Sequence, residues 1–362
     1  MMFNKRKRKK VLIVGYFNIN IGDDLFFKTI IERYPNVDFW ICTRHPYKQI
    51  LSFPNLHIIK FNILNGLFVK LMGKLCKMFF QFNAIVCIGG SIFMEKSNSG
   101  VCGTIENLAM CRKLFPLTPI VIIGSNYGPE HTLKFRENIR RLIENTSYTC
   151  FRDLYSYEIF KDCPKVSYAT DIVFSSSRKA CNRLKTNTVG ISIINIDKRK
   201  ELVDNKVYYN DFIKYIICKN IKQNKKVSLF SFCVREGDLE MCNNVYNTLS
   251  DSEKEKVEII SYDGDIDYFL SKLCKTELLY ATRYHAMILG LLYQIPTLPI
   301  IYSDKMLNVI RDIGVSNKVI DIRNLCNKME VNEDAIILDD NKLKQIIKSS
   351  EHQFSFTDKV LE

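Results

Sequence analysis

Leu278-Leu279-Tyr280-Ala281-Thr282-Arg283-Tyr284-His285-Ala286-Met287-Ile288-Leu289-Gly290 contains an apolar run, a short polar turn and a second apolar run. The first run predicts a buried strand, and the second predicts a helix that ends before Pro296. Thr282 is the expected N-cap of that helix. A strand that leads directly into a helix is the repeating unit of parallel α/β sheets. This stretch therefore predicts an α/β fold.

Arg283 and His285 lie in the first turn of the predicted helix. A helix N-terminus presents unpaired backbone N–H groups, and a guanidinium adds a planar donor fork that suits phosphate or carboxylate. An imidazole can transfer a proton near neutral pH. The pattern indicates a site for a small, multiply charged anion on which acid–base chemistry is done. The alternative is an arginine paired with a carboxylate and a histidine packed in the core.

The same alternation of short apolar runs and helical patterns continues along the whole chain. It predicts strands at 11–14, 37–41, 57–61, 84–88, 120–123, 148–151, 189–193, 227–232, 257–261, 278–281 and 297–301. Predicted helices in the first half cover 24–33, 64–81, 105–114, 133–145 and 154–161.

A polar, basic stretch at 175–187 interrupts this pattern and is typical of a linker. We therefore expect two doubly wound, Rossmann-like domains facing a cleft, an arrangement similar to GT-B enzymes. The expected parts are a basic tail at 1–10, an N-terminal domain at 11–180 and a C-terminal domain at 181–362. A helix around 341–349 is free to pack on either domain.

Ligands of such sheets bind beyond the C-terminal ends of the strands. In the first half, Gly22 predicts a tight turn before a helix that Asp23 or Asp24 caps; either carboxylate could instead accept a proton from a hydroxyl. Gly89 and Gly90 follow a strand, where they permit either a close backbone approach to a ligand or a simple turn.

Two cations follow other strands. Arg152 comes directly after one of them, and its alternative role is an ion pair with Asp153 or Asp171. Lys305 follows another strand, and its alternative is an exposed surface lysine.

Several of these stretches, taken in order, resemble the polysaccharide pyruvyl transferase family. The matching segments are GYFNINIGDD at 15–24, GGS at 89–91, GSNYGP at 124–129, FRDLYS at 151–156, TD at 170–171, RYHA at 283–286 and YSDK at 302–305. The resemblance runs from about Val11 to Gly314. The chain departs from the family pattern at Ser91, Ser125 and Tyr284.

The resemblance implies transfer of a pyruvyl group from phosphoenolpyruvate to two sugar hydroxyls, which forms a cyclic ketal. Arg152 and Arg283 would hold the donor, and His285 would protonate its vinyl carbon. The expected substrate-binding residues are Asn20, Gly22, Asp23, Gly89, Gly90, Tyr284 and Lys305. The acceptor would be a glycan or a lipid-linked glycan of the cell envelope. No cofactor is expected, and the sequence contains no His/Cys/carboxylate cluster at metal-ligand spacing.

Two other functions remain open. Two facing α/β domains with an arginine and a lysine in the C-terminal half would also suit a glycosyltransferase that uses a nucleotide sugar. The departures at Ser91, Ser125 and Tyr284 would also fit an inactive protein that binds sugar phosphates.

Composition and charge limit the classes of protein to which the chain could belong. The chain has 362 residues, of which 47% are hydrophobic and 25% charged, enough for two cores. Six positive charges of the net +13 lie at 5–10, and no basic face interleaved with aromatic residues predicts nucleic-acid binding. The 13 scattered cysteines suggest reduced thiols. With no signal peptide in the sequence, we expect a cytoplasmic protein.

Residues 64–82 form a cationic amphipathic pattern, with Lys70, Lys74 and Lys77 opposite a broad apolar face. A helix that covers a sheet has this pattern, and so has a helix that lies in a membrane interface. We expect the first role. The second would add a peripheral contact with the inner face of the cytoplasmic membrane.

Overall fold

The structure is a computed structural model that describes residues 8–43, 46–59, 81–95, 98–177, 186–315, 319–325 and 334–362. It divides into two compact units. Unit 1 comprises Met1–Phe17, Phe26–Ser175 and Lys348–Glu362, and unit 2 comprises Asn18–Leu25 and Ser176–Ile347. These units differ from the predicted domains 11–180 and 181–362, since residues 18–25 group with unit 2 and the C-terminal segment groups with unit 1.

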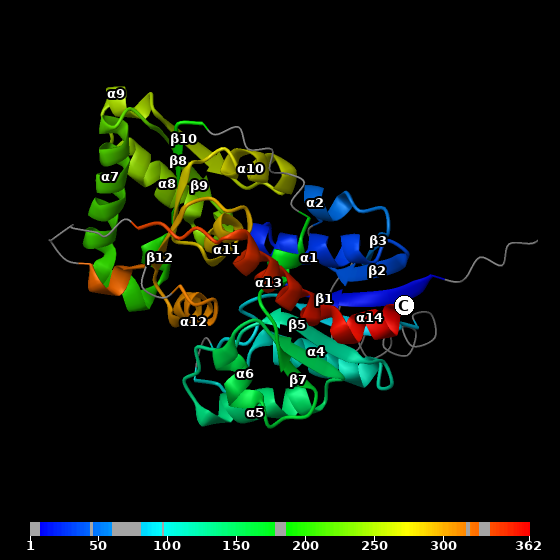
Figure 1. Cartoon of the computed structure of the whole chain (residues 1–362). Helices are drawn as coiled ribbons and strands as arrows, with labels where there is room; N and C mark the ends of the chain where they lie inside the picture. The colour runs from blue at the N-terminus through cyan, green and yellow to red at the C-terminus, as the bar shows by residue number, and fades with distance from the viewer. Residues whose placement is uncertain are drawn as a thin grey trace, which may run out of the picture. The chain divides into compact units, whose positions relative to one another are not determined.

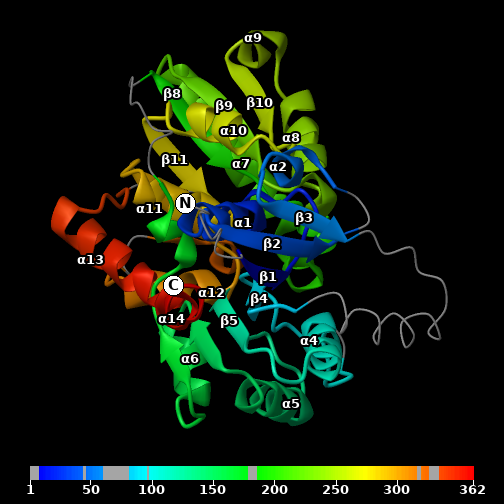
Figure 2. The ribbon, with the colours of Figure 1, turned by 90° about the vertical axis from the view of Figure 1, so that its right-hand side faces the viewer.

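Unit 1 is built on a seven-stranded parallel sheet (Figures 1 and 2). Its strands, in the spatial order β3-β2-β1-β4-β5-β6-β7, are β1 (Lys9–Val14), β2 (Val37–Cys42), β3 (Leu56–Ile59), β4 (Ala84–Ile88), β5 (Ile120–Ser125), β6 (Tyr148–Phe151) and β7 (Val166–Tyr168). The central strands β4 and β5 are buried throughout, because a parallel sheet is covered on both faces.

The predicted basic tail is partly ordered into this sheet. Strand β1 begins at Lys9, which is paired in register with Val37. A guanidinium nitrogen of Arg8 lies 3.1 Å from a carboxylate oxygen of Asp38. The prediction of a tail up to residue 10 is therefore wrong at its C-terminal end.

Helices and short 3-10 turns connect the strands of unit 1. They are α1 (Ile21–Arg33), α2 (Lys48–Leu51), α4 (Gly103–Leu114), α5 (Leu133–Glu144), α6 (Leu154–Phe160) and η1 (Ile172–Ser175). Helix α5 buries Phe135, Ile139 and Ile143, which lie four residues apart and therefore on one face. The first turn of α1 groups with unit 2 and the rest with unit 1.

The C-terminal segment from Lys348 completes unit 1. It holds the last turn of α13 (Asp340–Glu351), whose earlier residues group with unit 2, and then η6 (His352–Phe354) and α14 (Ser355–Leu361). Gln353 is fully buried, and its carboxamide oxygen accepts a hydrogen bond from the backbone N–H of Gly124 at 2.9 Å. Its amide nitrogen donates to the carbonyls of Phe151, Ala169 and Thr170. Since these four groups end or follow strands β5 to β7, Gln353 fixes the segment to that edge of the sheet.

Unit 2 is built on a second parallel sheet, of six strands, in the spatial order β10-β9-β8-β11-β12-β13 (Figure 2). The strands are β8 (Thr188–Ser192), β9 (Lys226–Ser231), β10 (Val257–Ser261), β11 (Leu278–Ala281), β12 (Thr297–Ile301) and β13 (Ile320–Asp321). Its helices are α7 (Lys206–Lys222), α8 (Asp238–Asn247), α9 (Asp251–Lys254), α10 (Ile266–Leu273), α11 (Tyr284–Leu292) and α12 (Asp304–Asp312). Helix α11 buries every residue except His285, as its apolar sequence predicts.

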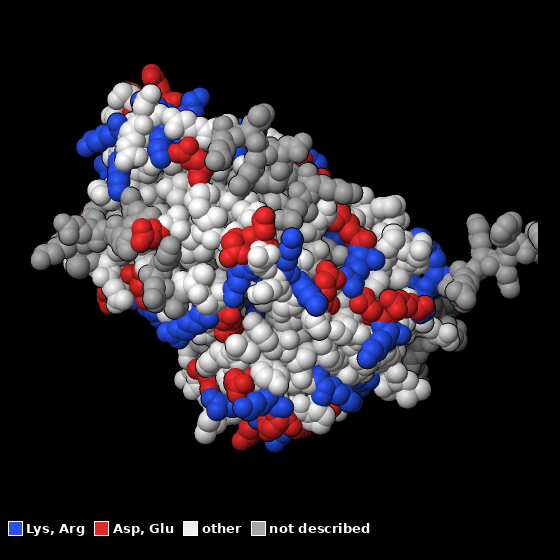
Figure 3. Space-filling view, in the orientation of Figure 1, with Lys and Arg blue, Asp and Glu red and all other residues white. Residues whose placement is uncertain are grey.

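The charge distribution and the cysteines concern two expectations drawn from composition, namely the absence of a basic face and reduced thiols. On the face shown in Figure 3, lysine and arginine side chains lie among aspartate and glutamate. The nine cysteines from Cys42 to Cys242 that the structure describes are free thiols. Cys274 is disulfide-bonded, so the prediction of reduced thiols throughout is wrong at that position.

Two observations concern the membrane predictions. Most of the segment 64–82 lies outside the described residues, so its two predicted roles stay predictions. Among the helices that the structure describes, none combines the length and the apolar character needed to cross a bilayer.

Candidate active site

The loops that follow the strands of unit 2 collect at the C-terminal edge of its sheet, because all neighbouring strands are parallel. These loops contribute η2 (Ile196–Lys198) after β8, η4 (Val234–Glu236) after β9, and the N-termini of α11 and α12 after β11 and β12. The charged side chains that they bring to this edge are those of Arg199, Glu236, Asp238, Arg283 and Lys305.

Arg283 is the N-cap residue of α11 and makes no side-chain cap hydrogen bond. Its backbone N–H and that of Thr282 donate to the hydroxyl of Ser192 at 3.0 and 2.9 Å. Thr282 is therefore not the cap that the sequence predicts; its hydroxyl accepts a hydrogen bond from Tyr209 at 3.4 Å. Ser192 ends the neighbouring strand β8, so this contact fixes the start of α11 to the centre of the sheet.

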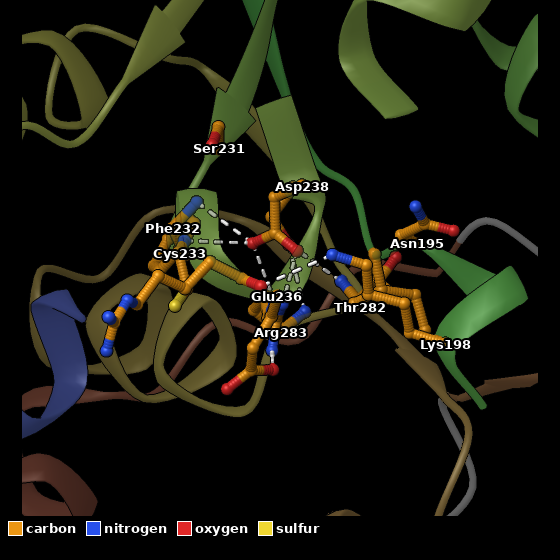
Figure 4. Close-up of polar contacts among 12 residues, drawn as sticks. Asn195, Lys198, Ser231, Phe232, Cys233, Glu236, Asp238, Thr282 and Arg283 are labelled. Carbon is orange, nitrogen blue, oxygen red and sulfur yellow. Dashed lines mark hydrogen bonds and ion pairs between the residues drawn. The ribbon is translucent and has the colours of Figure 1, made fainter. Parts of the chain in front are cut away.

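The guanidinium of Arg283 lies between two carboxylates (Figure 4). Its Nε donates to Asp238 at 2.8 Å, its Nη2 contacts the other oxygen of Asp238, and its Nη1 contacts Glu236. Burial alone would lower the pKa of Arg283, but Asp238 and Glu236 outweigh it and hold that pKa well above the usual value. Arg283 is therefore a permanent cation with a fixed orientation, and the carboxylate pairing considered as an alternative is present.

Asp238 is the inner partner of this pair. Its side chain is fully buried and also accepts hydrogen bonds from the backbone N–H groups of Phe232 and Cys233, at 3.1 and 3.0 Å. The carboxylate thus joins the loop after β9 to Arg283. A buried carboxylate needs several donors of this kind to stay ionised.

Two further cations lie close to the ring of Tyr302. The guanidinium carbon of Arg199 lies 4.4 Å from the ring centroid, and Nζ of Lys305 lies 5.7 Å from it. Burial would raise the pKa of Tyr302, but Lys305, Arg199 and Arg283 outweigh burial and lower it. Three cations therefore act on Tyr302 at this edge of unit 2, beside the carboxylates of Glu236 and Asp238.

His285 lies against the start of α1. A Cβ placed on Gly22 would come within 1.9 Å of Nδ1 of His285, so only glycine admits the imidazole here. Asn20 caps α1, because its side-chain oxygen accepts a hydrogen bond from the backbone N–H of Gly22 at 3.0 Å. Nε2 of His285 is closed to solvent, and the edge of the ring packs against Tyr284 with the centroids 5.0 Å apart.

This arrangement corrects three predictions at the start of α1. The helix begins at Ile21, so Gly22 lies inside its first turn, and the positive φ of the preceding turn is at Ile19, with a φ of 51°. Asp23 and Asp24 are in the first turn and are not the cap. Asp24 is buried and accepts a hydrogen bond from the hydroxyl of Tyr262 at 2.6 Å.

Unit 1 holds the other predicted cation. Arg152 is 3% exposed; its Nη1 lies 2.9 Å from Asp171, and its Nη2 donates to the side-chain oxygen of Asn126 at 2.6 Å. A Cβ on Gly90 would come within 2.5 Å of both guanidinium Nη atoms. Gly90 therefore permits a close approach by Arg152, and Gly89 supplies the positive φ, 134°, at the end of β4.

The predicted site residues thus fall into two groups. Unit 2 brings together Asn20, Gly22, His285 and Tyr284, and it places Arg283 and Lys305 at the same sheet edge. Unit 1 brings together Gly90 and Arg152, with Gly89 adjacent to Gly90. Five further residues of the site were not predicted from the sequence: Arg199, Glu236, Asp238, Tyr262 and Tyr302. Tyr262 and Tyr302 directly follow β10 and β12, and the other three lie in the loops after β8 and β9, so their place beyond the C-terminal ends of strands is the signal that would have indicated them.

The fold is similar to that of several solved structures. The HepE protein of Anabaena, solved with UDP and glucose, has a TM-score of 0.52 and 10% identity over 98% of this chain and 92% of its own. The UDP-GlcNAc 2-epimerase of Methanocaldococcus jannaschii has a TM-score of 0.55 and 12% identity over 97% and 99%. At such identities the likeness shows the fold alone, which is GT-B with two Rossmann-like units.

The family follows from the sequence itself. No curated protein is similar enough in sequence to be matched with the chain. The model of the family described as polysaccharide pyruvyl transferase matches residues 20–304, which include Asn20, Arg152, Arg283 and His285. The chain therefore belongs to the polysaccharide pyruvyl transferases, a family of enzymes.

Proposed function

We propose that the protein transfers the pyruvyl group of phosphoenolpyruvate to two hydroxyls of a sugar and forms a cyclic ketal. The observation that carries the proposal is the cluster of Arg283, Arg199 and Lys305 at one sheet edge of unit 2, with His285 in the first turn of α11. Phosphoenolpyruvate carries a phosphate and a carboxylate on three carbons, and a compact set of cations suits such a molecule.

Arg283 is suited to orient the donor rather than merely to attract it. Asp238 holds Nε and Nη2, so the guanidinium plane is fixed before any ligand arrives. Preorganised donors stabilise charge without reorganising during the reaction, and this is the largest contribution in many enzymes. The Nη1 atom, which contacts Glu236, faces the less buried side of the cluster.

His285 is the proposed proton donor. Its proton adds to the vinyl CH2 of the donor, which becomes a methyl group, and the neighbouring carbon becomes electrophilic. One sugar hydroxyl attacks this carbon, and its proton restores the imidazolium. The second hydroxyl then displaces the phosphate as the C–O bond to phosphate breaks, its proton leaves with the phosphate, and the ring closes.

The acceptor is proposed to be a glycan or lipid-linked glycan of the cell envelope, modified on the cytoplasmic side of the membrane. The role of Arg152 as a second donor-binding cation is also a proposal. The guanidinium already pairs with Asp171 and Asn126, so a loss of activity on its removal would need a parallel measurement of folding.

The direct test incubates the purified protein with phosphoenolpyruvate and free or lipid-linked glycans, and follows phosphate release together with the mass gain of a pyruvyl ketal. Arg283→Lys keeps the charge but loses the fork, and we expect kcat/KM to fall by about 10²–10³. His285→Ala should bind the donor but not turn it over. His57→Ala, which removes an exposed histidine of β3, is the matched control and should keep full activity.

Two outcomes would overturn the proposal. Normal turnover by Arg283→Lys and His285→Ala would remove both residues from the chemistry. Cleavage of a nucleotide sugar, with no ketal formed from phosphoenolpyruvate on any acceptor, would assign the protein to glycosyl transfer.

A further inference from the structure

Glu236 occupies a distinctive position in the cation cluster of unit 2. One of its carboxylate oxygens, Oε2, contacts Nη1 of Arg283 and lies 3.3 Å from Nη2 of Arg199. The positive charge of Lys305 acts on the same carboxylate. A single anionic oxygen therefore bridges two guanidinium groups, as an oxygen of a bound phosphate would.

The two carboxylates of the cluster are not equivalent. The side chain of Asp238 is fully buried and is held by two backbone N–H groups in addition to Arg283. The side chain of Glu236 is 40% exposed, and among the described residues it contacts the guanidinium groups of Arg283 and Arg199. Asp238 is therefore the structural counter-ion of Arg283, whereas Glu236 can leave without exposing a backbone donor.

The loop that carries Glu236 is short and ends at a glycine. It is the three-residue turn η4, and the next residue, Gly237, has a φ of 86°. The turn itself is held by Arg235, which contacts the side chain of Asn18 and whose carbonyl accepts a hydrogen bond from Lys198 at 3.3 Å, so only the side chain of Glu236 needs to move. Glycine adopts such a positive φ without strain, and it can also adopt other backbone conformations.

The Nε–H group of Arg199 can donate a further hydrogen bond. Its Nε is closed to solvent and has no hydrogen-bond partner among the residues that the structure describes. A buried N–H without an acceptor costs free energy, so an acceptor at this position is favourable. A phosphate, with three terminal oxygens, offers more acceptors than the single oxygen of Glu236 that now bridges the guanidinium groups.

We propose that Arg199, Arg283 and Lys305 form the phosphate subsite of the donor, and that Glu236 fills this subsite until a phosphate monoester displaces it. This inference rests on the proposed function because it names how the same donor is bound. Exchange of a carboxylate for a dianionic phosphate gains one negative charge beside three cations. The return of Glu236 would favour release of the product phosphate.

The experiment measures binding of inorganic phosphate by titration calorimetry, which requires no pyruvyl transfer. Glu236→Gln removes the competing charge, and we expect phosphate to bind at least about tenfold more tightly than to the unaltered protein. Arg199→Gln should weaken phosphate binding by about tenfold or more. Glu258→Gln and Arg311→Gln make the same charge changes elsewhere in unit 2 and should leave the dissociation constant unchanged.

Equal phosphate affinities of Glu236→Gln and the unaltered protein would overturn the subsite, and so would a change of the same size in the two control variants. Glu236→Asp, which keeps the charge but shortens its reach, covers the case in which the glutamine variant does not fold; it should also tighten phosphate binding. If phosphate binding responds as expected while no ketal forms, the subsite stands and the proposed function fails. If ketal forms and phosphate binding does not respond, only the subsite fails.

Discussion

The contact between Gly22 and His285 supports a quantitative prediction about unit 2. In Gly22→Ala the new Cβ would lie 1.9 Å from Nδ1, 2.4 Å from Cε1 and 2.7 Å from Cγ of His285. Ordinary carbon contacts need about 3.5 Å, so the ring or the helix start must move by roughly 1.5 Å. Overpacking of this kind costs about 1–3 kcal/mol of folding free energy.

The clash should affect activity more than stability. A misplacement of about 1 Å at a reacting group costs about 10²-fold in rate, so Gly22→Ala should lower kcat by that order while the protein stays folded. Gly103→Ala is the matched control because a Cβ there meets no atom within 4 Å. It should be neutral or slightly stabilising.

A double-mutant cycle isolates the contact. In a His285→Ala background the ring is absent, so the added Gly22→Ala should cost nothing, and alanine should even be favoured by up to about 1 kcal/mol within a helix. The measurement is the free energy of unfolding of the four proteins in urea. An equal loss from Gly22→Ala in both backgrounds would show that the imidazole does not require the glycine, and our account of the motif would be refuted.

The remaining predictions concern unit 1. Gln353→Leu should lower the free energy of unfolding by about 3 kcal/mol or more, since it leaves buried backbone groups at Gly124 and Ala169 without partners; Gln223→Leu on the exposed end of α7 is the control, and equal losses would contradict the assignment. Burial would raise the pKa of Glu95, but hydrogen bonds from His131, Thr132 and Gly100 outweigh it and lower the pKa from 4.5 to about 2. The stability that Glu95 adds is therefore full above about pH 4.5 and is lost as the pH falls toward 2. The difference in melting temperature between the protein and Glu95→Gln should shrink over that range; a difference independent of pH would exclude this ionisation as its cause.

The fold could be predicted from the sequence because its strands are short, continuous apolar runs. Strands β4, β5, β11 and β12 are buried on both faces, and such runs have few alternative structures. The sequence did not predict β7 and β13, which are only three and two residues long and lie at the sheet edges. A strand of that length has no period to detect.

The sequence indicated some residues of the cluster in unit 2 but none of the contacts between them. Arg283 was found because it follows β11, but its partners Glu236 and Asp238 lie more than forty residues earlier in the chain. The turn predicted at Gly22 is wrong for the same reason, since Gly22 lies inside α1. Local sequence predicts a turn at a glycine, whereas this glycine is needed by a side chain 263 residues later.

Each of the two units contains a glycine that makes room for a functional side chain. Gly90 and Gly22 each lie where a Cβ would overlap a predicted functional side chain of the same unit, Arg152 in the first case and His285 in the second. Each motif glycine therefore leaves the space that a charged or titratable side chain occupies. We therefore expect a substitution at either glycine to be coupled in stability to its partner position, so that a smaller side chain at 285 or 152 should relieve the overlap.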